Sequence, residues 1–188
     1  MKSIMVDLES LGTVADACIM SIGAVKFDLD SDKIDDNGFY ASVSIESNLD
    51  LKRRIQEDTL IWWMNQGADA KGVFNEAKQT LKNALRDLSE WIGDGDYEVW
   101  ANGADFDTPM LAHAFTQCGI EIPWKFWNSR CFRTYKNLPG ARNAKVLFEG
   151  TKHNALFDAL HQAKTAQAIQ SKLFSNSHPF VVKPKVAT

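Results

Sequence analysis

The chain has 188 residues, of which 45% are hydrophobic, and it carries a formal net charge of −3. This length fits one domain with a sizeable core, and no apolar run approaches the roughly 20 residues that span a bilayer. A protein that grips long nucleic acid by charge alone is usually basic, so the acidic balance excludes that mode and leaves only a short, locally basic or metal-assisted contact.

The first third of the chain predicts three antiparallel strands. We expect a buried strand at residues 4–8, a second at 19–29 that is rich in β-branched residues, and a third at 39–45. The acidic stretch 28–37 ends in Asn-Gly, which is typical of a hairpin turn.

Helices and strands alternate in the rest of the chain. The stretch 75–92 predicts an amphipathic helix, because its leucines recur at spacings of three and four residues. The other elements that we expect are a short helix at 59–66, a strand at 97–101, a helix at 108–118, a strand at 127–132 and a last helix at 156–173. This order predicts a single α/β domain over residues 1–174, a mixed sheet flanked by helices, followed by an extended tail at 175–188.

Two carboxylates are expected on the same face of the first strand. Asp7 and Glu9 lie two residues apart, and side chains with that spacing in a strand point the same way. Neighbouring like charges repel in a low dielectric, and a divalent cation removes this cost. Alone, Asp-x-Glu is a weak indication of a metal site.

Two further acidic segments follow. Asp107 comes after the fourth predicted strand, but before Thr108-Pro109 it also fits the N-cap of a helix. His153 and Asp158 are five residues apart, which is about 140° on a continuous helix, so they meet only if His153 lies before the helix start and folds back. Asn154 suits that N-cap, and the alternative is that Asp158 only complements the helix dipole.

Taken together, the three segments resemble a known nuclease family. In chain order they read Asp-x-Glu, Asn-x-x-x-Phe-Asp and His-x-x-x-x-Asp, similar to the DEDDh branch of the DnaQ-like 3′→5′ exonucleases in the ribonuclease H-like superfamily. The resemblance extends from about Met1 to Lys172 and implies a ribonuclease H-like mixed five-stranded sheet. Three segments are also similar to a compact group of mycobacterial exoribonucleases, phage exodeoxyribonucleases and exodeoxyribonuclease VIII-like proteins: Asp7–Thr13, Thr59–Gln66 and Ser129–Thr134.

The resemblance implies a two-metal hydrolysis that removes mononucleotides from the 3′ end of DNA or RNA. Asp7, Glu9, Asp107 and Asp158 would bind two Mg²⁺ or Mn²⁺ ions, since carboxylate oxygens suit these ions. His153 would be the general base, because histidine titrates near neutral pH.

Candidate substrate contacts lie around these motifs. Leu11, Gly12 and Thr13 follow the metal pair, and Asn102 and Phe106 shape the turn before Asp107. Trp62 and Trp63 either stack on a base or anchor their helix in the core. Arg130 and Arg133 open a stretch with six basic residues and one acidic residue that ends at Lys152, which is either a phosphate track or a solvated loop.

Two alternatives stay open. The fold could serve as a catalytically silent module that binds nucleic acid or protein, or as a nuclease of another specificity, such as an endonuclease. The sequence does not decide between DNA and RNA. The resemblance favours a homodimer, and the absence of a signal-peptide pattern before Ser3 predicts a soluble cytoplasmic protein without membrane contact.

Overall fold

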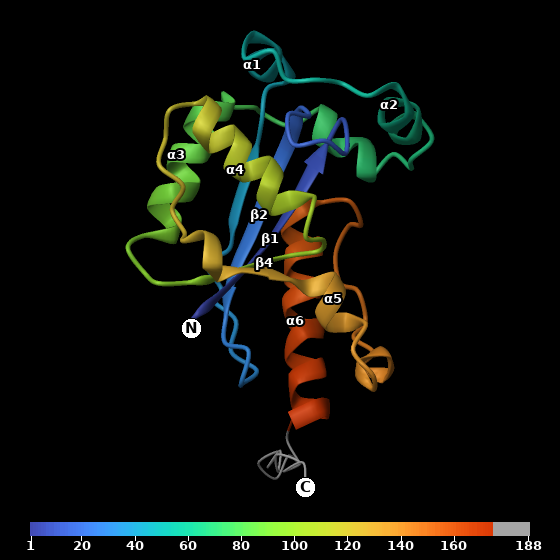
Figure 1. Cartoon of the computed structure of the whole chain (residues 1–188). Helices are drawn as coiled ribbons and strands as arrows, with labels where there is room; N and C mark the ends of the chain where they lie inside the picture. The colour runs from blue at the N-terminus through green and yellow to red at the C-terminus, as the bar shows by residue number, and fades with distance from the viewer. Residues whose placement is uncertain (175–188) are drawn as a thin grey trace, which may run out of the picture.

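A mixed five-stranded sheet forms the centre of the molecule, in a computed structural model that describes residues 1–174 (Figure 1). The strand order is β3-β2-β1-β4-β5, with β1 antiparallel to β2, β2 antiparallel to β3, and β4 parallel to both β1 and β5. The strands are β1 (Ser3–Ser10), β2 (Ile19–Phe27), β3 (Phe39–Ser42), β4 (Glu98–Ala101) and β5 (Ser129–Cys131). This architecture confirms the predicted α/β class.

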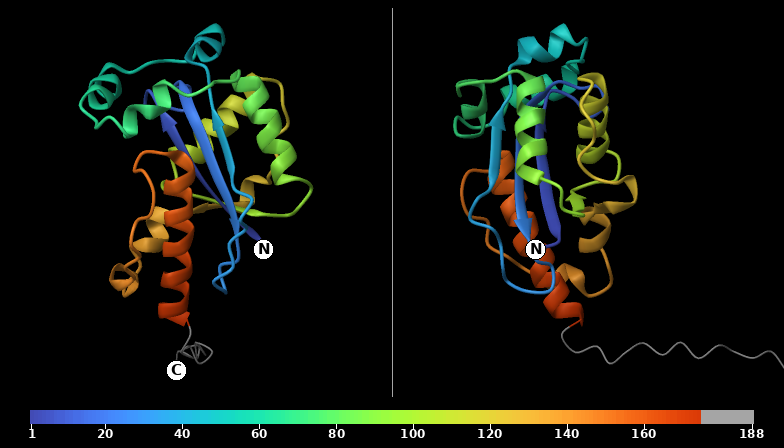
Figure 2. Two further views of the ribbon diagram at one scale, coloured as in Figure 1. Left: turned by 180° about the vertical axis from the view of Figure 1, so that it is seen from behind. Right: turned by 90° about the vertical axis from the view of Figure 1, so that its left-hand side faces the viewer.

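Helices cover both faces of the sheet (Figure 2). In the described part of the chain the α-helices are α1 (Ile45–Asp50), α2 (Glu57–Met64), α3 (Leu81–Ile92), α4 (Asp107–Gln117), α5 (Phe132–Lys136) and α6 (Ala155–Phe174). Short 3₁₀ turns occur at η1 (Ala70–Phe74), η2 (Phe126–Asn128) and η3 (Ala141–Asn143). No helix of residues 1–174 is long and apolar enough to cross a membrane.

The side chains of β1 point alternately into two hydrophobic cores, one on each face of the sheet. Ile4, Val6 and Leu8 are buried against α3 and α4, whereas Met5 is buried on the opposite face with the alanines of α6. Successive strand residues point to opposite faces, so Asp7 and Glu9 continue the row of Met5 and face α6. A third cluster, which includes Leu11 and Trp63, lies under α2 beyond the carboxyl end of β1.

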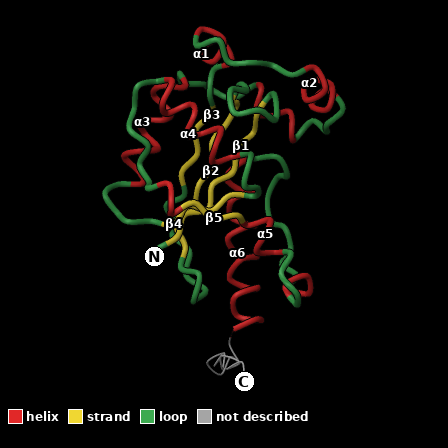
Figure 3. The backbone as a smooth tube through the Cα atoms, in the orientation of Figure 1, coloured by secondary structure: helices red, strands yellow, loops and turns green. Residues whose placement is uncertain are grey.

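Several predicted boundaries were wrong for local reasons. The third strand ends at Ser42 because Ser44 caps α1, its side chain accepting a hydrogen bond from Ser47 N. The helix predicted at 75–92 begins only at Leu81, since Asn75 ends the η1 turn and Gln79 forms a bridge with Val43, so the residues before Leu81 are loop (Figure 3).

The predicted fifth strand was also too long. It covers only 129–131, and the chain turns into α5 at Phe132, where Cys131 caps the helix. The other predicted helices and strands are confirmed to within a few residues. The predicted tail at 175–188 lies outside the described residues.

Candidate active site

Asp7 and Glu9 lie at the carboxyl end of β1, on the face toward α6. Glu9 is 8% exposed and Asp7 is half-buried. A register shift between Glu9 and Ser10 ends the regular pairing with β2, so the strand leaves the sheet just after the acidic pair. The predicted common orientation of these two carboxylates is therefore found.

Gly23 lets α6 come close enough to bring in a third carboxylate. It pairs with Asp7 across the sheet, and a Cβ on Gly23 would lie 2.1 Å from the carbonyl carbon of Ala155. Any side chain there would hold the first turn of α6 away from the strand. With glycine, ligand oxygens of Asp7, Glu9 and Asp158 all lie within 4.8 Å of one another.

Asp107, at the start of α4, approaches the acidic cluster from the β4 side of β1. The strands β1 and β4 are parallel, so their carboxyl ends meet at one edge of the sheet, and α4 begins there. Asp107 is 1% exposed, and its Oδ1 accepts a hydrogen bond of 3.2 Å from Leu8 N. The N-cap position belongs to Phe106, so the alternative reading of Asp107 as a helix cap is not what the structure has.

Without a bound cation, burial and mutual repulsion disfavour the charged forms of these carboxylates. Burial, and then the charges of Asp158 and Asp107, raise the pKa of Glu9 from 4.5 to about 8. Burial raises the pKa of Asp107 to about 7 and that of Asp158 above its ordinary value. The pKa of Asp7 is raised well above its usual range by burial and then by Asp107, Glu9 and Asp158.

These carboxylates fit divalent cations. Oδ2 of Asp107 and Oδ2 of Asp158 are buried and have no hydrogen-bond partner within the described residues. Buried carboxylate oxygens without partners are costly, and hard cations such as Mg²⁺ and Mn²⁺ are bound by such oxygens. The donor set is all oxygen, which suits these ions better than zinc.

Gln162 is a site residue that the sequence reasoning missed. It lies one turn after Asp158 on α6, and its Nε2 donates a hydrogen bond of 2.7 Å to Oδ1 of Asp7. Gln162 is 6% exposed, and its Oε1 has no partner among residues 1–174. The i+4 spacing from Asp158 was the signal that pointed to it, because residues so spaced share a helix face.

His153 lies just before α6, as predicted from its spacing. Asn154 caps the helix, its Oδ1 accepting from Leu156 N and Phe157 N at 3.2 and 3.3 Å. His153 has a φ of 62°, and its backbone forms a hydrogen bond with the Asp158 carboxylate. Burial raises the pKa of Asp158, and this hydrogen bond partly offsets the rise. The chain therefore folds back at His153 and brings this residue beside Asp158.

The paired tryptophans have different environments. Trp63 is 1% exposed, donates from Nε1 to Ser10 O at 2.9 Å and anchors α2 in the core, so it offers no face to a base. Trp62 is 43% exposed, and its ring lies edge-on to that of His153 with centroids 5.0 Å apart. Of the two alternatives for Trp63, the structure therefore has the core anchor, whereas Trp62 borders the candidate site.

The segment after β1 is held by polar side chains from elsewhere. Leu11 is 1% exposed, so only its backbone can reach a substrate, whereas Thr13 is exposed. Thr13 N donates to Oε1 of Gln56 at 2.5 Å. Arg53, 2% exposed, donates to the carbonyls of residues 15 and 17. A Cβ on Gly12 would lie 2.8 Å from Oε1 of Gln56 and 2.9 Å from Cβ of Ala17, so a side chain at Gly12 would displace the Gln56 side chain that holds Thr13.

A cavity of about 580 Å³ opens beside Asp107. Thr13, Phe106 and Arg133 are among the residues that line it. The charge of Arg133 lowers the pKa of Asp107, in opposition to burial, so the guanidinium lies near the carboxylates. Asn102 is not among the residues that line the cavity, and its Oδ1 accepts a hydrogen bond from Lys136 Nζ at 3.0 Å.

Arg130 is engaged elsewhere. Its guanidinium forms an ion pair of 2.7 Å with Glu98 and donates to Trp127 O. Glu98 is the first residue of β4 and pairs with Ser3, at the end of the sheet away from Asp7 and Glu9. Arg130 therefore lies away from the carboxylates, whereas Arg133 lines the cavity, and the phosphate track stays a prediction that the structure favours at Arg133 alone.

Comparisons with known proteins agree on family and fold. The family model described as the 3′-5′ exoribonuclease Rv2179c-like domain matches residues 2–170. No curated protein sequence matches the chain.

Similar solved structures have low sequence identity. Pop2p of S. pombe, in its Mg²⁺- and Mn²⁺-bound form, is 16% identical with a TM-score of 0.67, over 94% of this chain and 85% of Pop2p. The nuclease domain of 3′hExo, a DEDDh family member bound to rAMP, is 13% identical with a TM-score of 0.57, over 89% and 90%. Cell-death related nuclease 4 is 15% identical with a TM-score of 0.58, over 88% of this chain and only 62% of that protein. These likenesses confirm the ribonuclease H-like fold.

Proposed function

This chain belongs to the Rv2179c-like family of 3′-5′ exoribonuclease domains, and we propose that it hydrolyses nucleic acid from the 3′ end and releases mononucleotides. The observation that supports this most directly is the meeting of Asp7, Glu9 and Asp158, whose ligand oxygens lie within 4.8 Å of one another, with buried Asp107 close enough for its charge to raise the pKa of Asp7. Two of them keep an oxygen that is buried without a partner among the described residues.

We propose that these four residues hold two divalent cations, Mg²⁺ or Mn²⁺. Four carboxylates carry four negative charges, so two such ions neutralise the site before a phosphate arrives. When bound, a pair of metal ions stabilises both the attacking and the leaving oxygen of a phosphodiester displacement. The solved structure of Pop2p holds Mg²⁺ and Mn²⁺ on a similar fold, which is consistent with this choice of ion.

The proposed general base is His153. Its position before α6 brings it beside Asp158, and the exposed Trp62 supports one side of its ring. A ring nitrogen of His153 would accept the proton of the attacking water.

The cavity beside Asp107 is the proposed site for the end of the substrate strand. Phe106 offers an apolar wall, Thr13 a hydroxyl, and Arg133 a cation for a phosphate. These groups lie next to the acidic cluster, so a strand whose terminal nucleotide fills the cavity would place its last phosphodiester near the carboxylates. Asn102 would act indirectly, by holding Lys136 at the turn before Asp107.

The test is digestion of matched RNA and DNA oligonucleotides with Mn²⁺. A 5′-labelled oligonucleotide should shorten one nucleotide at a time, a 3′ block should stop it, and a 5′ block should not. A spread of internal fragments would point to an endonuclease, and no cleavage with either metal or polymer would point to a silent binding module. The comparison of RNA with DNA also identifies the preferred sugar.

Three further expectations stay predictions. A homodimer would appear in analytical ultracentrifugation as twice the 21.1 kDa chain mass. A cytoplasmic location would appear on cell fractionation. A domain boundary at 174 would appear as a protease-resistant fragment that ends near this residue.

A further inference from the structure

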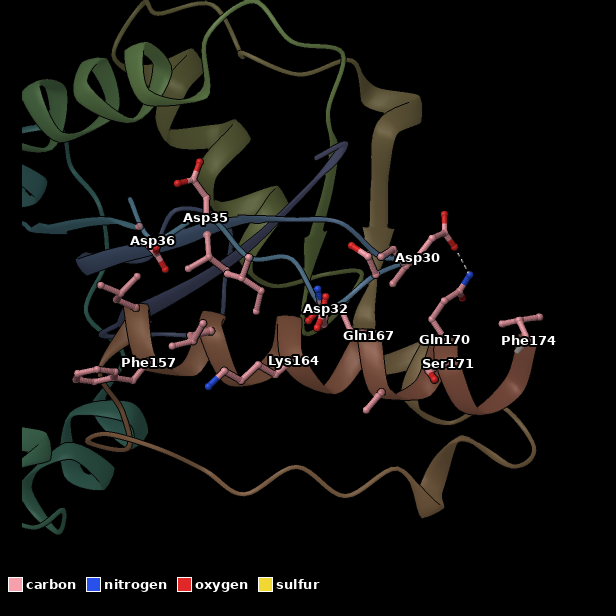
Figure 4. Close-up of a pocket in the computed structure, with 18 residues that line it drawn as sticks. Asp30, Asp32, Asp35, Asp36, Phe157, Lys164, Gln167, Gln170, Ser171 and Phe174 are labelled. Carbon is pink, nitrogen blue, oxygen red and sulfur yellow. Dashed lines mark hydrogen bonds between the residues drawn. The ribbon is translucent and has the colours of Figure 1, made fainter. Parts of the chain in front are cut away.

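An elongated groove of about 1010 Å³ runs along α6 (Figure 4), and none of the four carboxylates lines it. It lies between α6 and the loop that joins β2 to β3. Its floor is apolar, and an aromatic ring lines it near each end of the helix, Phe157 at the first turn and Phe174 at the last. The floor is formed mainly by Val25, Leu29, Ile34, Leu156 and Leu160.

The edge of the groove opposite α6 is acidic. It carries Asp30, Asp32, Asp35 and Asp36, and none of the ion pairs formed within residues 1–174 involves them. Lys164, which also lines the groove, is paired with Glu149 at 2.6 Å. The described part of the chain therefore leaves this acidic edge without a cationic partner.

The acidic loop is itself anchored to α6, so the groove has a defined shape. Nε2 of Gln167 donates to the carbonyls of Asp28 and Lys33, both at 3.0 Å, and Nε2 of Gln170 donates to Oδ1 of Asp30 at 2.7 Å. Near the other end, a Cβ on Gly38 would lie 2.8 Å from Cδ1 of Leu156. Asp30 thus lies near the last turns of α6, and Asp35 and Asp36 lie toward Phe157 (Figure 4).

We propose that residues 175–188 of this chain bind in this groove, running back along α6 from Phe174. The segment contains the apolar run Phe180-Val181-Val182 and the cations Lys183 and Lys185, and it has no acidic residue. Its apolar residues match the floor, and its two lysines match the acidic edge.

The chain length sets the register. The seventeen residues from Phe157 to Phe174 span about 26 Å of helix at roughly 1.5 Å per residue. An extended chain covers that distance in about eight residues at roughly 3.3 Å each. Counting from Phe174 at this rise, Phe180 to Val182 lie about 20 to 26 Å along the helix, level with Leu160 and Phe157, and Lys183 follows at about 30 Å, at the end of the groove where Asp35 and Asp36 lie.

This inference is independent of catalysis, and its test uses amide hydrogen exchange on the full chain. The amides of residues 180–182 should exchange at least about tenfold more slowly than in a free peptide of the same sequence. Reversing the acidic edge with Asp35→Lys and Asp36→Lys should remove this protection, and so should Lys183→Asp with Lys185→Asp. Combining all four changes should restore it.

The matched control is Asp94→Lys, an exposed acid on the connection between α3 and β4, which should leave the protection unchanged. Phe180→Ser removes the aromatic ring that is proposed to meet the apolar floor, and it should also abolish protection. Protection that is absent in the wild type, or that survives both charge reversals, would overturn the proposal. Protection that grows with protein concentration would mean that the segment binds a second copy, which also overturns binding within one chain.

Discussion

Nε2 of Gln162 donates a hydrogen bond of 2.7 Å to Oδ1 of Asp7, and so links residues that are 155 positions apart in the sequence. The bond orients the Asp7 carboxylate, whose charged neighbours Asp107, Glu9 and Asp158 are all negative. It also lowers the pKa of Asp7, whereas burial and these three acids raise it. Because Gln162 is on the same helix as Asp158, it also couples the positions of α6 and β1.

Gln162→Leu should therefore weaken metal-dependent activity by roughly 10–100-fold, the usual effect of removing a group that orients a metal ligand. The loss should appear as a higher Mn²⁺ concentration at half-maximal rate and as weaker Mn²⁺ binding in calorimetry. Gln167→Leu is the matched control, since it removes two hydrogen bonds from the same helix but none to a carboxylate of the site. Equal effects of the two changes would make Gln162 a merely structural residue.

Without metal, the protein should become less stable as the pH rises. The pKa of Glu9 is 4.5 in an unfolded chain and about 8 in the folded one, so between these values the folded state holds a proton that unfolding releases. The free energy of unfolding then falls as the pH rises through this window, by an amount on the order of 5 kcal/mol for such a shift.

Denaturant unfolding in EDTA at pH 5, 6.5 and 8 measures this slope. Glu9→Gln should make the free energy of unfolding depend less steeply on pH and should raise it at pH 8. The exposed Glu46→Gln should change neither the pH dependence nor the value at pH 8. Saturating Mn²⁺ should restore stability at pH 8 in the wild type. A slope that is unchanged in Glu9→Gln contradicts the explanation.

Gly23→Ala should remove activity by moving α6. Its new methyl group would overlap the backbone of Ala155, so the first turn of α6 must shift and take Asp158 away from Asp7. We expect a loss of at least about 100-fold, since a displacement near 1 Å has that effect on an aligned site. Gly67→Ala, with nothing within 4 Å of the added carbon, is the control. Normal Mn²⁺ binding by a folded Gly23→Ala protein would show that α6 had not moved.

His153→Ala should lower turnover by roughly 10²–10⁴-fold, the usual contribution of a general base. Mn²⁺ affinity should change little, because His153 is not an expected ligand, and the variant should lose a step in the pH–rate profile at saturating metal. His161→Ala is the comparison, because His161 also lies near Asp158 but packs against Phe148. If His153→Ala loses Mn²⁺ as strongly as Asp158→Ala does, His153 supports the metal site instead.

Arg133→Ala and Arg130→Ala form a pair that tests the substrate cavity. Arg133 lines the cavity near Asp107, so its loss should raise KM by about tenfold with little change in kcat. Arg130 is held by Glu98 at the other end of the sheet, so its loss should leave KM unchanged and cost at most about 1 kcal/mol of stability. The opposite ranking of KM values would move the phosphate contact to Arg130.

Local patterns in the sequence determined much of this protein. The two-residue spacing of Asp7 and Glu9 fixed their common face, because alternation in a strand is a property of the backbone alone. Asn154 before an apolar helix predicted the cap, and with it the return of His153 toward Asp158. The chain order of the acidic segments indicated the family, which the match over residues 2–170 confirms.

What depends on packing between distant segments was decided only by the tertiary structure. Trp62 and Trp63 are equivalent in sequence, but the one that meets Ser10 is buried and the other borders the site. Arg130 became an ion-pair partner of Glu98 because β4 and β5 are neighbours. No local rule marks Gly23 as the point where α6 crosses β2, since a missing side chain matters only where another backbone comes within a few ångströms, and that approach brings Asp158 to Asp7.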